Sequence, residues 1–215
     1  MPRPRFDKLP EERRQEILQS AAQEFAEHGY SGASMNQIIE RAGLSKGAMY
    51  YYFDDKQDLY TTVMVRTMQQ VVELIGDLPQ VVTAEAFWVE MERLLTHTLS
   101  FTMRNPTLLG LMRSLAEGIS RGELGEELEA WHHKLHQDWN VRFVKLGQDV
   151  GAVRTDLPTD LLIALLEGLN QSGDAWFSLH FEELGTEGLD RLMSKLIGIY
   201  RKMLEPDSKS PEVIE

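Results

Sequence analysis

Residues 34–56, SMNQIIERAGLSKGAMYYYFDDK, hold the side chains whose types and spacing could do chemistry. Three consecutive tyrosines begin four positions after Lys46, and Lys56 follows them closely. Hydroxyl and ammonium groups bond to phosphate oxygens, and a lysine can also reach the O6 and N7 atoms of guanine. The segment is therefore a candidate for contacts with the phosphates and base edges of duplex DNA.

Two short helices, near 35–41 and 45–51, are predicted to position these groups. Ser34 stands where the first helix needs an N-cap, and Gln37 three residues later completes a pattern that resembles a capping box. Gly43 permits the positive φ that a tight turn between helices often requires. This order of helix, glycine turn and helix is typical of a helix-turn-helix.

The second helix has one inward and one outward face. Ser45 is its predicted N-cap, and Met49 and Phe53, spaced by four, are expected to point inward. The outward face would meet base edges in the major groove. It holds Lys46, Gly47, Ala48, Tyr51 and Tyr52.

The stretch GYSGASMNQIIERAGLSKGAMYYYFDDKQDLY resembles the N-terminal region of the TetR family of bacterial regulators. The resemblance covers about residues 10–65. It includes the Ile-Ile…Ala-Gly-Leu-Ser core, the Lys-Gly-x-Met-Tyr-x-Tyr-Phe recognition helix and the Asp-Lys-x-x-Leu start of the next helix. It implies an N-terminal DNA-binding domain followed by an all-helical ligand-binding and dimerisation domain.

The resemblance implies that Tyr50 and Lys56 grip phosphates. At Ser34-Met35 many members carry two threonines, and because methionine has no hydroxyl we expect one phosphate contact fewer. The expected DNA-binding residues are Ser34, Asn36, Gln37, Ser45, Lys46, Gly47, Ala48, Tyr50, Tyr51, Tyr52 and Lys56.

Composition excludes several other classes of protein. The chain of 215 residues has no cysteine, so it has neither disulfides nor thiolate metal sites. We find no apolar run long enough to span a bilayer and no signal peptide, and we expect a cytoplasmic protein. The net charge is −12, of which residues 1–66 carry −1 and the remainder −11. The acidic region after residue 66 would repel DNA and so help to orient the near-neutral region 1–66 toward it.

The rest of the chain reads as helical, with Pro and Gly at the boundaries, so we predict an all-α fold of about nine helices. Besides the two short helices, the predicted helices cover 10–28, 56–76, 84–103, 106–120, 123–149, 158–182 and 186–204. The predicted domains are a DNA-binding domain over 1–56, a ligand-binding and dimerisation domain over 57–205, and a disordered tail over 206–215.

An effector pocket is expected in the second domain. Glu167, Asn170, Asp174 and Phe177 follow spacings of four or three and share a helix face, which could bind a cationic or hydrogen-bonding ligand. A solvated face or a hydrogen bond in a dimer interface explains the same pattern. The apolar candidates for the pocket are Met68, Met91, Met112, Trp131 and Trp139. The alternative for these five residues is that they pack in the core and play no part in binding.

A cluster of histidines at 132, 133 and 136 prompts a metal hypothesis. His132 and His136 are one helical turn apart, but surface histidines on an acidic helix explain this spacing, and we predict no metal site and no cofactor. An enzyme that uses this cluster is the alternative from another class, yet we find no nucleophile–base pair, phosphate loop or HExxH motif.

The combined hypothesis is a homodimeric repressor that releases a pseudo-palindromic operator when it binds a small molecule of unknown identity. The last two helices are expected to form the dimer, and no membrane contact is expected. An activator, or a regulator controlled by a protein partner, remains an alternative. Arg3 and Arg5 lie before the first helix, in an arm that either inserts into a minor groove or is a disordered terminus.

Overall fold

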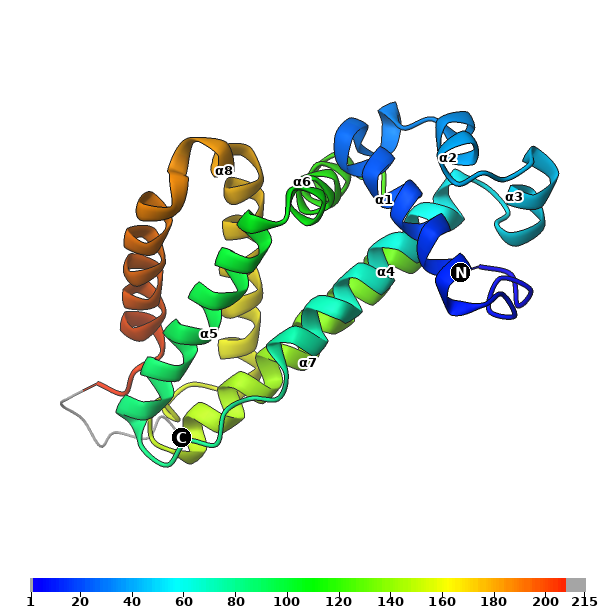
Figure 1. Cartoon of the computed structure of the whole chain (residues 1–215). Helices are drawn as coiled ribbons and strands as arrows, with labels where there is room; N and C mark the ends of the chain where they lie inside the picture. Colours follow the sequence, from blue (N-terminus) through cyan, green and yellow to red (C-terminus); the bar gives the residue numbers. More distant parts are fainter. Residues whose placement is uncertain (1, 208–215) are drawn as a thin grey trace. The chain divides into compact units, whose positions relative to one another are not determined.

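The computed structural model describes residues 2–207, apart from the side chains of residues 74, 75, 174, 175, 177–179, 181–187, 189 and 190. This part of the chain is helical and contains no strand, which confirms the all-α prediction (Figure 1). None of its helices is long and apolar enough to cross a membrane. The helices are α1 (Glu11–Gly32), α2 (Met35–Arg41), α3 (Lys46–Tyr52), α4 (Lys56–Ile75), α5 (Ala84–Arg104), α6 (Pro106–Arg121), α7 (Glu126–Asp149) and α8 (Thr159–Leu204).

Local signals explain where α6 begins and ends. At α6 the Asn105 side chain accepts a hydrogen bond from the Leu108 N–H at 3.1 Å, and Pro106 occupies the first turn. The helix stops at Gly122, whose φ of 64° is left-handed. The predicted break signals at both ends are therefore confirmed.

The end of α1 differs from the prediction. The helix predicted over 10–28 continues to Gly32 as α1, across a kink at Gly29. Gly29 has φ 66° and ψ 176°, a conformation that glycine adopts without strain. The glycine therefore bends the helix, and one further turn follows it.

Helix α8 folds back on itself, so that Figure 1 shows two antiparallel arms. The Tyr200 hydroxyl donates to Oδ1 of Asn170 at 2.6 Å. Thirty residues of straight helix would separate these positions by about 45 Å. The two arms correspond to the helices predicted at 158–182 and 186–204, and with them the described residues hold the nine helices expected.

The chain divides into two compact units. The first unit comprises Met1–Leu74 and Thr102–Trp131, and the second comprises Ile75–Phe101 and His132–Glu215. These units differ from the functional domains predicted over 1–56 and 57–205, because α6 packs against α1 and joins the first unit. The functional boundary stays a prediction, and residues 208–215 of the expected tail lie outside the described residues.

The first unit has one core that joins α1, α4 and α6. Gly110 of α6 lies so close to Ala26 that an added Cβ would be 2.6 Å from the Ala26 carbonyl oxygen. Deeper in the core, the hydroxyls of Tyr60 and Ser114 are 2.9 Å apart, and burial raises the pKa of Tyr60 to about 12. These contacts fix α1 and α4, the helices on either side of the helix-turn-helix.

The second unit has its own aromatic core. Phe87 and Trp88 of α5 contact Phe143 of α7, with ring centroids 5.0 and 6.3 Å apart. Leu162 and Ile197, from the two arms of α8, complete the cluster. Both arms of α8 are therefore tied to α5 and α7.

Candidate nucleic-acid interface

Helices α2 and α3 form the predicted helix-turn-helix. Gly43 has φ 58°, and its N–H donates to the Glu40 carbonyl at 3.0 Å. The Leu44 N–H donates to the Ile39 carbonyl at 3.0 Å, and the Leu44 side chain packs against the core of the first unit. Glycine at position 43 therefore lets the chain reverse within a few residues, as expected.

The orientation of α3 is set by its cap and its buried face. The Ser45 hydroxyl accepts a hydrogen bond from the Ala48 N–H at 3.1 Å, which confirms the predicted N-cap. Met49 and Phe53 are fully buried in the core. The opposite face of α3 therefore turns away from the first unit.

The residues of α3 that are predicted to contact DNA lie mostly on that outward face. Lys46 and Gly47 are exposed, Ala48 is half-buried, and the side chains of Tyr50 and Tyr51 are 40% and 48% exposed. Asn36 and Gln37 on α2 are exposed as well. The fold thus presents hydroxyl, ammonium and amide groups from both helices to the solvent.

Tyr52 is placed differently from the prediction. Its ring is half-buried against the core, 6.0 Å from the ring of Phe6 in an edge-to-face arrangement. Tyr52 follows Met49 by three positions, so both side chains lie on the buried face of α3. The outward reading face is therefore narrower than predicted, and a DNA contact by Tyr52 stays a prediction.

The start of α2 corrects the predicted capping box. Ser34 occupies the N-cap position, but its side chain makes no capping hydrogen bond. Its backbone N–H instead donates to Oε1 of Glu24 on α1 at 2.9 Å. A buried carboxylate from another helix therefore supplies the acceptor, which leaves the side chains of Ser34 and Gln37 out of the cap.

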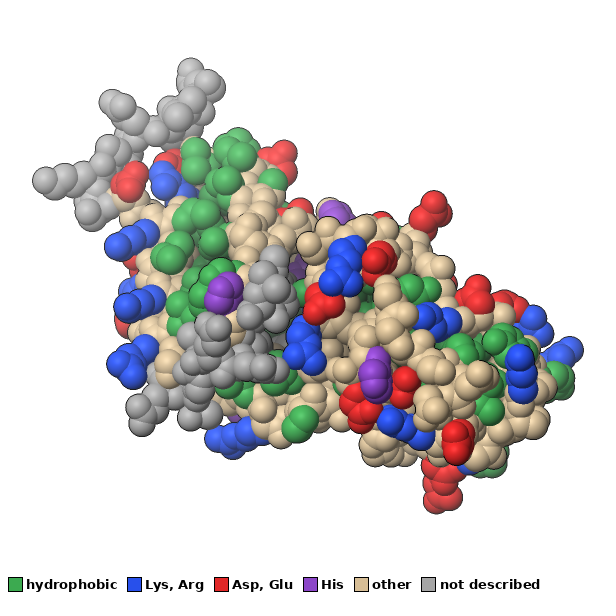
Figure 2. All heavy atoms as spheres, turned by 90° about the horizontal axis from the view of Figure 1, so that it is seen from above, with side chains coloured by type: hydrophobic (Ala, Val, Ile, Leu, Met, Phe, Trp, Pro, Cys, Tyr) green, Lys and Arg blue, Asp and Glu red, His purple; other side chains and the backbone are tan. Residues whose placement is uncertain are grey.

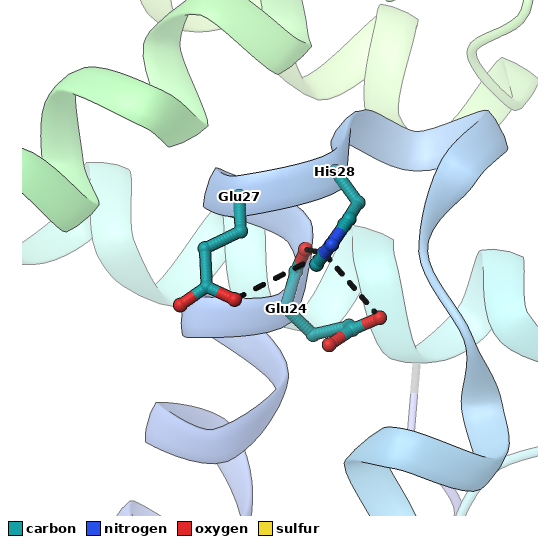
Figure 3. Close-up of side chains that lie close together, drawn as sticks. All are labelled: Glu24, Glu27 and His28. Atoms are coloured by element: carbon teal, nitrogen blue, oxygen red, sulfur yellow. Dashed lines mark hydrogen bonds and ion pairs between the residues drawn. The ribbon is translucent and has the colours of Figure 1, made fainter.

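Glu24, Glu27 and His28 lie together on α1 (Figure 3). The His28 Nδ1 atom is 3.5 Å from Glu24 and 4.0 Å from Glu27, and these three residues could hold a metal ion. However, Nη2 of Arg41 on α2 already lies 2.9 Å from Glu27 and 3.6 Å from Glu24. The guanidinium supplies the positive charge that two carboxylates need, so we interpret the cluster as a brace between α1 and α2.

Lys56 begins α4 and turns toward the end of α1. Its Nζ donates to the carbonyl oxygens of Ser31 and Ala33, each at 3.2 Å, and lies 4.8 Å from the ring centroid of Tyr30. Carbonyls at a helix C-terminus carry partial negative charge, which a lysine stabilises. Lys56 therefore braces α4 against α1, and its predicted phosphate contact stays a prediction.

The predicted effector residues do not belong to one compact unit. Met68, Met112 and Trp131 belong to the first unit. Those in the second unit are Met91, Trp139, Glu167 and Asn170, together with Asp174 and Phe177, whose side chains lie outside the described residues. A single pocket formed by the whole set stays a prediction.

A polar network in the second unit includes two residues that the sequence did not indicate. Asn170 receives the Tyr200 hydroxyl hydrogen and donates to Oδ1 of Asn140 at 3.2 Å. Asn140 is only 2% exposed, and its Nδ2 has no hydrogen-bond partner among the residues that the structure describes. A buried amide donor without an acceptor is costly, so this position suits a ligand oxygen. Asn140 stands between Trp139 and Val141 and carries no local signal.

The histidine cluster on α7 is a pair with a separate neighbour. The Nε2 atoms of His132 and His136 are 3.1 Å apart, whereas His133 is exposed. Burial, with smaller effects from His136 and His133, lowers the pKa of His132 to about 4. No further His, Cys, Asp or Glu with a described side chain joins the pair to make three metal ligands.

Comparison with known proteins agrees with this geometry. Residues 17–63 match the model of the bacterial regulatory proteins of the tetR family. The transcriptional repressor AcnR of Corynebacterium diphtheriae is 30% identical over 156 residues, which cover 72% of this chain and 75% of that protein. AcnR of Corynebacterium glutamicum is 28% identical over 196 residues, 90% and 95% of the two chains.

A solved structure shows the same fold. The transcriptional regulator FadR from Bacillus subtilis, in complex with stearoyl-CoA, superposes with a TM-score of 0.67. The sequences are 17% identical, and the match covers 85% of this chain and 96% of FadR. Together with the AcnR relatives and the helix-turn-helix described above, this shows that the chain belongs to the TetR family of bacterial transcriptional regulators.

Proposed function

We propose that this protein is a homodimeric repressor that binds a pseudo-palindromic operator and releases it when a small molecule binds. The observation that carries the proposal is the contrast along α3 between buried Met49 and Phe53 and the exposed side chains of Lys46, Tyr50 and Tyr51. The exposed face of such a helix can enter a major groove while its buried face stays packed against the core. The AcnR relatives are named as repressors, which supports a binding role rather than a catalytic one.

The surface of α8 supports a dimer. Leu161 and Leu165, one turn apart on the first arm, are 45% and 44% exposed, and Ile199 on the second arm is 48% exposed. Figure 2 shows hydrophobic side chains gathered on the left of the molecule, the side on which Figure 1 draws α8. Exposed apolar groups of this size favour association with a second copy. A two-fold dimer would present its recognition helices about 34–36 Å apart, one turn of B-DNA.

The effector is proposed to bind in the second unit and to carry a hydrogen-bond acceptor. The Nδ2 of buried Asn140, which has no partner among the described side chains, favours a carbonyl, carboxylate or hydroxyl oxygen, and the neighbouring core is apolar. FadR binds stearoyl-CoA, a molecule that combines such oxygens with an apolar chain. An amphipathic ligand is therefore the class to screen first.

Selection of duplexes from a random library, followed by footprinting, tests the proposed function. A repressor should select inverted half-sites one helical turn apart, and Lys46→Ala should weaken binding by about 1–3 kcal/mol and relax one base preference. Lys145→Ala removes an equal charge from the exposed surface of α7 in the second unit and should leave binding unchanged. Equal losses in both variants, or selection of no duplex, would contradict the proposal.

A second measurement tests whether the protein represses or activates transcription and whether a small molecule controls it. A reporter gene behind the selected operator should be silenced by the protein and restored by a ligand that also raises its melting temperature. Activation of the reporter, or the absence of any ligand effect across a screen of amphipathic compounds, would favour an activator or a partner-controlled regulator instead.

A further inference from the structure

The N-terminal arm, residues 2–9, is folded onto the helix-turn-helix. Phe6 is fully buried, and its ring centroid lies 4.8 Å from that of Phe53, the residue that ends α3. It also contacts the ring of Tyr52. An aromatic side chain buried this deeply anchors the segment that carries it. The arm is therefore an ordered part of the first unit, and the expectation of a disordered terminus is wrong for residues 2–9.

Charged groups hold the arm on both sides of Phe6. The Arg3 N–H donates to the Tyr52 carbonyl at 2.9 Å, and its Nε donates to Oδ1 of Asp54 at 2.8 Å. Asp7 pairs with Arg66 of α4, where the atoms are 3.0 Å apart. Arg3 is thus occupied by Asp54 and latches the arm to the residues that follow α3.

Arg5 is held in another way. Its guanidinium carbon lies 4.4 Å from the ring centroid of Tyr51, the most exposed tyrosine of α3. The side chain of Arg5 is exposed, and its guanidinium has no carboxylate partner among the side chains that the structure describes. Stacking uses the flat face of a guanidinium and leaves its N–H groups, which lie in the plane, free to donate.

We propose that the N-terminal arm is a second DNA-contacting element, in which Arg5 binds a backbone phosphate beside the groove that α3 enters. The inference rests on the DNA-binding function proposed above. Arg5 is already stacked on Tyr51, so little side-chain freedom is lost when a phosphate binds. In-plane N–H donors match the geometry of phosphate oxygens.

The salt dependence of operator binding tests the contact. Each phosphate contact contributes about 0.9 to the slope of log K against log salt concentration. Arg5→Ala should therefore lower the slope by about one for each half-site and weaken binding at low salt. Lys8→Ala is the matched control, because it removes an exposed positive charge from the same arm. If both variants behave alike, the assignment to Arg5 is wrong.

A double-mutant cycle between Arg5 and Tyr51 tests the role of stacking. Tyr51→Phe keeps the ring, so the loss caused by Arg5→Ala should stay as large as in the wild type. Tyr51→Ala removes the ring, and in that background the loss should shrink. Equal losses in all three backgrounds would show that Arg5 does not act from its position on Tyr51.

Three further outcomes separate the proposed phosphate contact of Arg5 from the proposed function and from a base contact. Loss of binding in Lys46→Ala with no change in Arg5→Ala would overturn the arm contact and leave the proposed function intact, whereas a wild type that binds no duplex would remove both. Exchange of A·T for G·C pairs beside the half-site should not change the ratio of wild-type to Arg5→Ala affinity. A changed ratio would indicate a base contact in the minor groove and would overturn the phosphate assignment.

Discussion

The carboxylate of Glu24, buried in α1, accepts a hydrogen bond from the backbone N–H of Ser34 at the start of α2. Glu24→Ala should lower the free energy of unfolding by about 1–3 kcal/mol, because the partly buried Ser34 N–H loses its hydrogen bond to a charged acceptor. For a chain of this size this corresponds to a fall in melting temperature of about 2–4 °C per kcal/mol. Differential scanning calorimetry measures both quantities.

Glu27→Ala is the control for Glu24. Glu27 lies on the same helix and also pairs with Arg41, but its side chain is exposed and accepts no backbone hydrogen bond in the described structure. The Glu27→Ala substitution should lower the free energy of unfolding by less than about 1 kcal/mol. Equal losses from the two variants would show that the link to Ser34 does not stabilise the start of α2.

Substitutions of Lys56 and Lys46 should distinguish an effect on protein stability from an effect on DNA affinity. Lys56→Ala removes two hydrogen bonds to the end of α1, so it should lower the free energy of unfolding by about 1–2 kcal/mol as well as the salt slope of DNA binding by about one. Lys46→Ala should change DNA binding alone, because its side chain is exposed and lies outside the core. Urea unfolding and salt titrations distinguish the two, and a Lys56→Ala protein that is unchanged in both would refute its role.

His132 should make the protein less stable as the pH falls. Its folded pKa of about 4 lies below the ordinary value of 6.5, so the unfolded chain binds the proton first. The free energy of unfolding should therefore decrease between about pH 6.5 and pH 4. His132→Gln should reduce this decrease, and His133→Gln, at an exposed neighbour, should not. Urea unfolding at several pH values gives the comparison, and identical pH profiles for the wild type and His132→Gln would disprove the assignment.

Leu165→Glu should break the proposed dimer. A two-fold interface would bury this carboxylate twice without a partner, so the dissociation constant should rise by about 100-fold or more. Val82→Glu is the control, because Val82 is also apolar but is 88% exposed in the segment before α5. Sedimentation equilibrium measures the association, and an intact Leu165→Glu dimer would move the interface away from this face of α8.

The sequence alone determined the features that depend on residues close together in the chain. The Ser45 cap, the positive φ of Gly43 and the inward pair Met49 and Phe53 each follow from neighbours within four positions. Helix boundaries such as Asn105-Pro106 are local in the same way. These signals were sufficient for an all-α fold and for the outward positions of Lys46, Gly47 and Tyr51 on the recognition helix.

Only the tertiary structure decided which distant groups meet. Glu24 reaches Ser34 across 10 positions, Lys56 reaches Ser31 across 25, Asn140 meets Asn170 across 30, and Arg3 meets Asp54 across 51. Such pairs depend on how helices pack, and packing depends on the shapes of many side chains at once rather than on any short pattern. For this reason the sequence predicted a capping box at Ser34 and an outward Tyr52, and left the N-terminal arm as either a minor-groove element or a disordered terminus. In the structure the Glu24 carboxylate binds the Ser34 N–H, the Tyr52 ring packs against the core, and Arg3 and Phe6 hold the N-terminal arm on the first unit.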